Sequence, residues 1–238
     1  MTTAPLALYG EALMRLIFPA PCGLCKTMLE IDERGVCPNC KSLLWKLRRG
    51  HAEGAVQHSL AGLVHAWALF SYEGPFKDLM ASIKILKKRW LLALFFEEIR
   101  QFSIQQLQKS PYDAIVPIPL DPGRWLEREF NQAEILAAEI SRSLKIPVKN
   151  LLGKHSLAEK QSRLSKKERL IHLRGAFFLK TKNTVHGLRF LLVDDVMTTG
   201  ATAQEAAKTL KNAGAKHVDL WALAHTPPAA GNRTGSPS

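Results

Sequence analysis

The sequence predicts an α/β fold in which a parallel sheet is flanked by helices, with a small cysteine-rich module preceding it. Segments with the apolar pattern of buried strands alternate with amphipathic helical segments through residues 61–225. The clearest unit is an uninterrupted apolar run at 190–193, followed by a short Thr/Gly turn and a helical pattern over 203–213. All four cysteines lie within residues 22–40, which sets a small module apart from the rest of the chain.

The length of 238 residues suits one α/β domain with a small appendage. We assign residues 1–50 to an N-terminal amphipathic helix (4–18) and the cysteine module, 61–225 to the α/β domain, and 226–238 to a disordered tail. No apolar run approaches the ~20 residues that span a bilayer, and no basic segment precedes the apolar N-terminus. We therefore expect a cytoplasmic protein without stable membrane insertion.

The segments between the two ends predict strands and helices in alternation. They are a polar linker over 46–60, a strand within 61–72, helices over 76–87 and 90–108, a strand over 114–119, and a helix from Arg124 to about Ser143. The second strand stops at Pro117, Ile118 and Pro119, and two prolines at the carboxyl edge of a sheet make a stiff loop. This loop is a candidate ligand-binding element.

The junction after the strand at 190–193 combines two acidic residues with a small, hydroxyl-rich turn. It consists of Val193, Asp194, Asp195, Thr198, Thr199, Gly200, Ala201 and Thr202. Ligands bind at the carboxyl ends of strands in open α/β sheets, and the amides of a helix N-terminus favour a phosphate. Two carboxylates would repel a simple phosphate, whereas a sugar phosphate offers them ribose hydroxyls as hydrogen-bond donors. The junction therefore suits a sugar phosphate, with bound magnesium offsetting the negative charge.

Two common phosphate motifs are absent from this junction. It contains no Gly-Lys-Ser/Thr of a Walker loop and no G-x-G-x-x-G of a dinucleotide-binding turn. The alternative interpretation is a plain strand–turn–helix in which Asp194 and Asp195 only cap the turn and face solvent.

The cysteines form two C-x-x-C pairs, Cys22/Cys25 and Cys37/Cys40, separated by eleven residues. Two such pairs across a short loop place four thiolates for one tetrahedral zinc ion. Two disulfides or a redox dithiol are the alternatives, and an intracellular location disfavours disulfides. Four thiolates would leave no position for a catalytic water, so we expect the zinc to be structural.

The net charge of +12 arises from 33 basic and 21 acidic residues and is unevenly distributed. Residues 77–89 contain five basic residues and one acidic residue, and residues 151–182 contain nine and two. Such clusters favour polyanions, polyphosphates first and nucleic acid second; a solvated basic surface is the alternative. Arg124 and Arg128, four residues apart, can share a helix face aimed at phosphates, or can instead pair with neighbouring glutamates.

The sequence VDDVMTTGAT resembles the 5-phosphoribosyl-1-pyrophosphate (PRPP) motif of type I phosphoribosyltransferases. Together with other features it resembles the ComF family, whose members join a four-cysteine zinc module to a phosphoribosyltransferase-like domain. These features are the two C-x-x-C pairs, VPIPL from Val116, REFNQAEILA from Arg128, and KQSRLSKKERLIHLRGAF over 160–177. The resemblance covers nearly all of residues 13–225. One departure is Glu129, where the family usually has a Gly that would permit a positive φ.

The resemblance implies a type I phosphoribosyltransferase-like sheet that binds PRPP with magnesium. Asp194 and Asp195, the candidate catalytic residues, would hold the ribose hydroxyls, and the turn at 198–202 would hold the 5′-phosphate. The loop at 117–119, with Arg124 and Arg128, would receive the pyrophosphate. Catalysis by such a site would depend on positioning and charge stabilisation.

The resemblance also implies a role in natural competence, in which imported single-stranded DNA is handled alongside a helicase-like partner. Lys166, Lys167 and Arg169 are the candidate DNA contacts. The competing hypothesis is an active phosphoribosyltransferase in nucleotide metabolism or salvage, for which the sequence does not identify the acceptor. A nucleotide-responsive regulator is the third, and no dedicated DNA-reading helix supports it.

Overall fold

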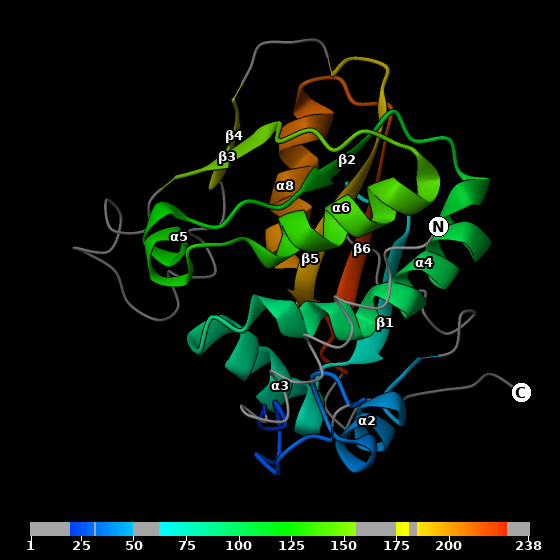
Figure 1. The fold of residues 1–238 in the computed structure, drawn as a ribbon. Coiled ribbons are helices and arrows are strands. Elements are labelled where there is room, and N and C mark those ends of the chain that lie inside the picture. Colours follow the sequence, from blue (N-terminus) through cyan, green and yellow to red (C-terminus); the bar gives the residue numbers. More distant parts are fainter. Residues whose placement is uncertain (1–19, 31, 50–61, 156–174, 181–184, 228–238) are drawn as a thin grey trace, which may run out of the picture.

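The computed structural model describes residues 20–30, 32–49, 62–155, 175–180 and 185–227. Its centre is a parallel four-stranded sheet in the order β1-β6-β5-β2 (Figure 1). The strands are β1 (Ala66–Ser71), β2 (Ala114–Pro117), β5 (Arg189–Met197) and β6 (His217–His225). The predicted parallel α/β sheet is therefore confirmed.

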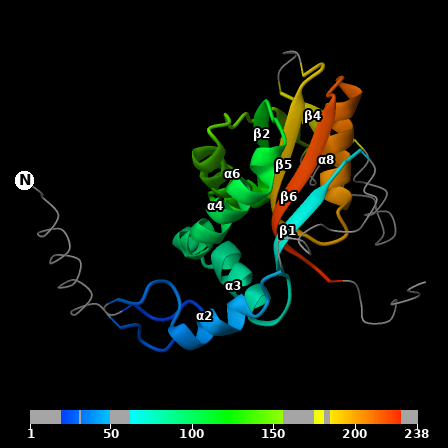
Figure 2. The ribbon, with the colours of Figure 1, turned by 90° about the vertical axis from the view of Figure 1, so that its right-hand side faces the viewer.

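Helices cover both faces of the sheet (Figure 2). They are α4 (Phe96–Gln105) and α6 (Gln132–Leu144) on one face and α8 (Ala201–Asn212) on the other. Successive side chains of a strand point to opposite faces. Leu191 and Val193 of β5 accordingly belong to the core on the α4/α6 side, and Phe190 and Leu192 to the core on the α8 side. Burial on both faces explains why β5 begins as an unbroken apolar run.

Two segments that the sequence predicts as single helices are each divided. The segment predicted over 90–108 forms the 3-10 helix η1 (Arg89–Phe95), then α4, then the 3-10 turn η2 (Leu107–Lys109). The helix predicted from Arg124 to Ser143 forms α5 (Pro122–Arg128) and α6. The prediction of continuous helices is wrong at both places. By contrast, α3 (Gly74–Ile85) agrees closely with the helix predicted over 76–87.

The break between α5 and α6 has a local cause. Glu129 adopts a left-handed conformation with φ of 64°, and its N–H donates to the Trp125 carbonyl at 2.8 Å, which ends α5. Asn131 then begins α6, because its side-chain oxygen accepts from the Ala133 N–H at 3.1 Å. The Asn131 amide also donates to the Ile118 carbonyl at 3.0 Å. One side chain thus ties the start of α6 to the loop after β2.

β5 continues beyond the apolar run that predicted it. Asp194, Val196 and Met197 are still paired with β6, so both aspartates lie inside the last part of the strand rather than after it. Strand β6 was not predicted. Nor was the separate antiparallel pair formed by β3 (Leu152–Lys154) and β4 (Phe177–Leu179).

The cysteine module shares the core of the sheet domain. Its helix α2 (Pro38–Trp45) begins at Pro38, directly after Cys37. The Trp45 ring stacks on Phe95 at 6.1 Å and meets Phe70 of β1 edge-on at 5.9 Å. Its indole N–H donates to Glu98 Oε1 at 3.0 Å. These contacts make the module a packed extension of the domain, seen below the sheet in Figure 1.

The residues after α2 are attached to β1. The Arg49 N–H donates to the Leu69 carbonyl, and the Ser71 N–H donates to the Leu47 carbonyl, both at 2.8 Å. Residues 47–49 are therefore not part of the linker predicted over 46–60. The helix predicted over 4–18 and the tail beyond Pro227 lie outside the described residues, and the predicted domain boundaries stay predictions. Within the described ranges, no helix has both the length and the apolar character that a membrane crossing requires.

Candidate functional site

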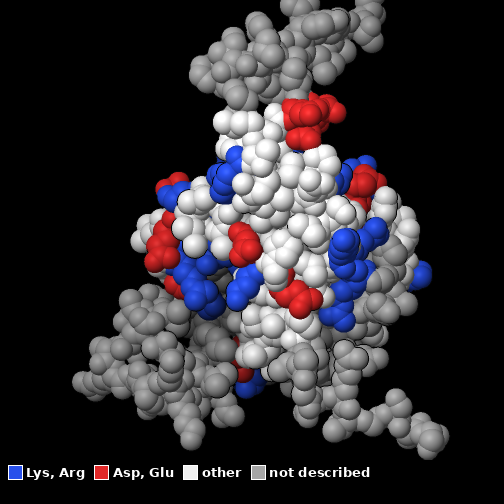
Figure 3. Space-filling model, turned by 90° about the horizontal axis from the view of Figure 1, so that it is seen from below, with Lys and Arg blue, Asp and Glu red and all other residues white. Residues whose placement is uncertain are grey.

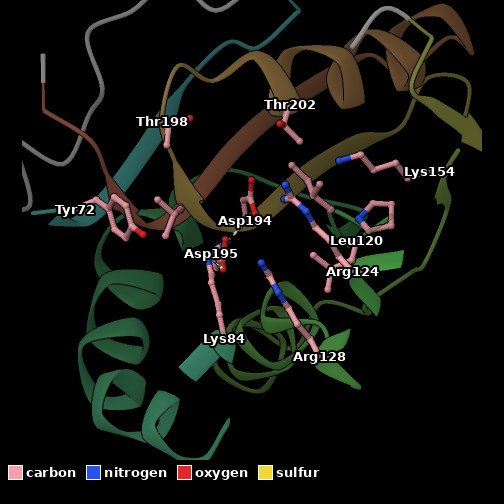
Figure 4. Close-up of a pocket in the computed structure, with 13 residues that line it drawn as sticks. Tyr72, Lys84, Leu120, Arg124, Arg128, Lys154, Asp194, Asp195, Thr198 and Thr202 are labelled. Carbon is pink, nitrogen blue, oxygen red and sulfur yellow. Dashed lines mark hydrogen bonds and ion pairs between the residues drawn. The ribbon is translucent and has the colours of Figure 1, made fainter. Parts of the chain in front are cut away.

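A pocket of about 240 Å³ opens at the carboxyl ends of β2 and β5 (Figure 4). Its lining includes these residues predicted from the sequence: Ile118, Pro119, Arg124, Arg128, Asp194, Asp195, Thr198 and Thr202. It also includes Tyr72, Lys84, Leu120, Lys154 and Val196, which the sequence analysis did not single out. The fold thus gathers the Asp pair, the Pro loop, the Thr turn and both arginines around one cavity.

Asp195 forms an ion pair that no sequence pattern indicated. Its Oδ2 lies 2.7 Å from Nζ of Lys84 in α3, and both side chains are largely buried, with exposures of 13% and 19%. Figure 4 shows Lys84 rising from α3 toward the two aspartates. The contact neutralises one of the two carboxylates in the pocket and fixes α3 against the end of β5.

Asp194 carries the most perturbed carboxyl group of the pocket. Burial, and then the neighbouring Asp195 carboxylate, raise the pKa of Asp194 from 3.8 to about 7. The Asp195 N–H donates to Asp194 Oδ1 at 2.8 Å, and the charges of Lys84 and Lys154 also act against this rise. A cation or hydroxyl donor placed against Asp194 would favour its ionised form.

The turn after β5 presents backbone amides to the pocket. Gly200 has φ of 76° and is the N-cap of α8, a conformation that a side chain adopts only with strain. The first N–H groups of a helix have no intrahelical partner, and they point toward this side. Thr198 and Thr202 line the cavity, while the Thr199 hydroxyl accepts from the Ala201 N–H at 3.4 Å. The turn therefore has the donors for an anion.

The opposite wall of the pocket is basic. Arg124 and Arg128 extend from α5 toward the aspartates (Figure 4). Asp121 caps α5 by accepting from the Arg124 N–H at 3.1 Å, and its Oδ2 lies 3.5 Å from Arg124 Nε. Glu129, a predicted alternative partner for the arginines, pairs instead with Lys87. Both guanidinium groups thus remain directed at the cavity.

Lys154 of β3 adds a third cation to this wall (Figure 4). Burial lowers the pKa of Lys154, and the nearby Arg124 acts in the same direction. Its Nζ also lies 5.2 Å from the centre of the Phe177 ring of β4. An anion placed against this amine would stabilise its charged form.

Some predicted residues do not reach the cavity wall. Val193 is fully buried in the core, and Pro117 lies within the buried end of β2. Thr199, Gly200 and Ala201 shape the turn without lining the pocket. Among the residues that sequence reasoning missed, Tyr72 is the last residue of the segment predicted to hold the first strand and directly follows β1, and that position could have identified it.

The four cysteine sulfurs can share one metal ion. They lie within 4.8 Å of one another, and the Cys25 and Cys37 sulfurs are 3.7 Å apart. Two thiolates, each about 2.3 Å from a tetrahedral zinc, would be separated by about 3.8 Å. The Cys37 N–H donates to the Cys22 sulfur at 3.3 Å, and the Thr27 hydroxyl lowers the pKa of Cys25 to about 6. None of the four is in a disulfide.

Acidic residues neutralise part of the positive charge of the basic segment at 77–89. Within 77–89, Lys84 pairs with Asp195 and Lys87 with Glu129. From below, basic side chains gather at two places with acidic ones between them (Figure 3). Lys166, Lys167 and Arg169, the predicted DNA contacts, lie outside the described residues.

The chain is similar to one family model and to several known proteins. Residues 131–235 match the family model of the phosphoribosyl transferase domain. The chain is 30% identical over 228 residues to competence protein F of Haemophilus influenzae, covering 89% of this chain and 99% of that protein. It is 29% identical to competence protein ComFC of Bacillus subtilis, covering 79% and 82%. It is 28% identical to the DNA utilization protein YhgH of Escherichia coli, covering 89% and 99%.

Proposed function

The chain belongs to the competence protein F (ComF) family, and we propose that it binds PRPP and acts in the handling of imported single-stranded DNA. The observation that carries PRPP binding is the pocket itself. It combines two carboxylates, an amide-rich turn and four cationic side chains. PRPP carries ribose hydroxyls, a 5′-phosphate and a pyrophosphate, so a single PRPP molecule would contact all three features of the pocket.

Each part of PRPP has a counterpart in the pocket. Asp194 and Asp195 would accept hydrogen bonds from the ribose hydroxyls. The turn at 198–202 would hold the 5′-phosphate at the N-terminus of α8. Arg124, Arg128 and Lys154 would face the pyrophosphate, where bidentate guanidinium contacts suit phosphate oxygens.

Magnesium fits this site through the chemistry of the donors. Carboxylate and phosphate oxygens are the ligands that it prefers, and Asp194 is an acid whose ionised form a cation would stabilise. Bound with PRPP, magnesium would neutralise charge on the pyrophosphate. The chain's own contribution is to orient the ribose and to hold the anionic groups at opposite ends of the pocket.

Phosphoribosyl transfer at this pocket is the second candidate function, favoured by the match to the phosphoribosyl transferase domain. An acceptor would form a bond to C1 of the ribose while the bond from C1 to pyrophosphate breaks. The pyrophosphate leaves with the electron pair, and positive charge develops on the ribose ring. Asp194 and Asp195 would then stabilise the ring electrostatically, while the basic wall would stabilise the leaving group.

Calorimetric titration of the zinc-loaded protein with magnesium–PRPP tests the binding proposal. We expect saturable binding that weakens at least roughly tenfold when Asp194 and Asp195 are both replaced by Asn. Lys154→Met should also weaken it. Lys208→Met is the matched control, because Lys208 is exposed on the far part of α8. Absence of binding to the wild-type protein would refute the proposal.

Pyrophosphate release then separates the two candidate functions. The protein is incubated with magnesium–PRPP and pooled nucleobases or ammonia, with the Asp194→Asn/Asp195→Asn protein as control. Release that the double substitution abolishes would identify a transferase. Binding without release would identify a PRPP-binding protein.

The DNA part of the proposal rests on the names of the relatives and on the basic segment at 151–182. Contact with phosphates predicts affinity for single-stranded DNA that falls as salt rises. Replacing Lys166, Lys167 and Arg169 by Glu should abolish it, whereas Lys208→Glu with Lys211→Glu should not. No affinity at low salt would end this part and leave PRPP binding untouched.

We also infer that the four cysteines hold a structural zinc ion. The supporting observations are the separation of 3.7 Å between two sulfurs and the packing of the module into the core. Four thiolates complete a tetrahedral sphere, so such a zinc stabilises the fold without taking part in chemistry.

A further inference from the structure

A second group of metal-binding side chains lies at the other end of the sheet from the PRPP pocket. His217 and Asp219 occupy the first and third positions of β6, and side chains two apart on a strand share a face. His65 immediately precedes β1, and the pairing of Ala66 with Leu220 brings it beside Asp219. The potential ligand atoms of the three residues all lie within 4.8 Å of one another. Two segments of chain thus converge at the amino ends of the strands.

The separations fit a shared ion. His217 Nε2 is 2.8 Å from Asp219 Oδ2, and His65 Nδ1 is 3.4 Å from Asp219 Oδ1. Two ligand atoms about 2.1 Å from a tetrahedral zinc ion would lie about 3.4 Å apart, so the His65–Asp219 separation matches and the His217–Asp219 separation is shorter.

Nε2 of His217 lacks a hydrogen-bond partner within the described part of the chain. Nε2 is buried and makes no hydrogen bond there, although a carboxylate oxygen lies 2.8 Å away. A ring nitrogen and a carboxylate oxygen this close together, without a hydrogen bond between them, are compatible with both atoms binding one ion.

The surroundings hold Asp219 in place as they would a metal ligand. Its side chain is fully buried, and its oxygens accept from the Tyr112 hydroxyl at 2.6 Å and from the His65 N–H at 2.9 Å. The His65 ring stacks on Trp67 with centroids 5.4 Å apart. Outer hydrogen bonds and packing of this kind orient first-sphere ligands.

We propose that His65, His217 and Asp219 bind a divalent transition metal of the zinc class, separately from the four cysteines. Two imidazoles and one carboxylate form a donor set that zinc takes when a fourth position stays open. The His65 side chain is 59% exposed, so water or an external ligand would complete the sphere. Arg189, paired with His217 between β5 and β6, adds positive charge nearby. The affinity is therefore expected to be below that of the thiolate site.

The test is a calorimetric titration of ZnCl₂ into full-length protein whose cysteine module is already loaded. We expect one further zinc per chain, with the total counted by elemental analysis. His65→Gln and His217→Gln should each abolish this second equivalent. Tyr112→Phe keeps all three ligands and removes one orienting hydrogen bond, so it should weaken binding by about 10- to 100-fold. His186→Gln replaces an exposed histidine that is not one of the three proposed ligands and should leave binding unchanged.

His65→Gln is the deciding variant, because an exposed side chain can be replaced without disturbing the fold. Zinc binding by His65→Gln with the wild-type stoichiometry and affinity would overturn the proposal. A total of one zinc per wild-type chain would do the same, and the trio would then only order the amino ends of β1 and β6 by hydrogen bonding. Neither result depends on whether PRPP binds.

Discussion

Replacing Asp194 by Asn should stabilise the protein, and the gain should grow as the pH rises. The folded chain holds this carboxyl group with a pKa of about 7, against an ordinary value of 3.8 for aspartate. Deprotonation is therefore easier in the unfolded chain than in the folded one. An amide keeps the size and the hydrogen-bonding oxygen of the side chain but cannot ionise, so the substitution removes an unfavourable charge from the pocket.

The sign and the magnitude follow from proton linkage. Between pH 3.8 and about 7 the folded state binds more protons than the unfolded state, so stability falls as the pH rises through this window. Above the folded pKa the full difference applies, and a shift of this size corresponds to an upper limit of about 4 kcal/mol. At pH 5.5 the loss of stability has reached only about half of this limit. The stabilisation by Asp194→Asn should therefore be about 2 kcal/mol larger at pH 8 than at pH 5.5.

Urea denaturation followed by tryptophan fluorescence at the two pH values measures this difference. Urea is uncharged and leaves the ionic strength constant, and the buffer must be free of phosphate, which would bind the pocket. Asp78→Asn is the matched control, because Asp78 is an exposed carboxylate on α3. It should show no difference between the two pH values.

Equal effects of Asp194→Asn at pH 5.5 and pH 8 would refute the reasoning, as would destabilisation at pH 8. The same variant should lose affinity for magnesium–PRPP. A residue whose replacement stabilises the fold while removing ligand binding is one whose unfavourable ionisation is retained for function.

Two further predictions concern the cysteine module and the α5–α6 turn. Chelation of the zinc should unfold residues 20–45. The fluorescence emission of Trp45, which stacks on Phe95, should then change. A dispersed amide NMR spectrum for this segment in the metal-free protein would contradict the prediction. Glu129→Gly should stabilise the protein by about 0.5 kcal/mol. Glycine relieves the strain of the left-handed backbone at this position, about 1 kcal/mol, and this gain exceeds the loss of the exposed ion pair with Lys87. Urea denaturation measures the change in the free energy of unfolding. A lower value for the variant would show that the ion pair contributes more than the backbone strain costs.

Features that depend on neighbours along the chain could be predicted from the sequence. Spacing alone identified the four cysteines as one cluster, because two C-x-x-C turns bring their own thiols together. The apolar run at 190–193 and the turn at 198–202 likewise indicated a buried strand that leads into a helix N-terminus. Strand direction then places Asp194 and Asp195 at the ligand-binding edge of a parallel sheet.

Which residues the predicted site residues contact depends on how the chain folds. Lys84 reaches Asp195 across more than one hundred residues of sequence, and Lys154 reaches the pocket from a strand that no pattern predicted. His65, His217 and Asp219 converge through the pairing of the first and last strands of the sheet. Periodicity records which face of an element is buried, whereas these contacts depend on the order of strands and the docking of helices. Charge compensation at Asp195 and a candidate second metal site therefore emerge only once the chain is folded.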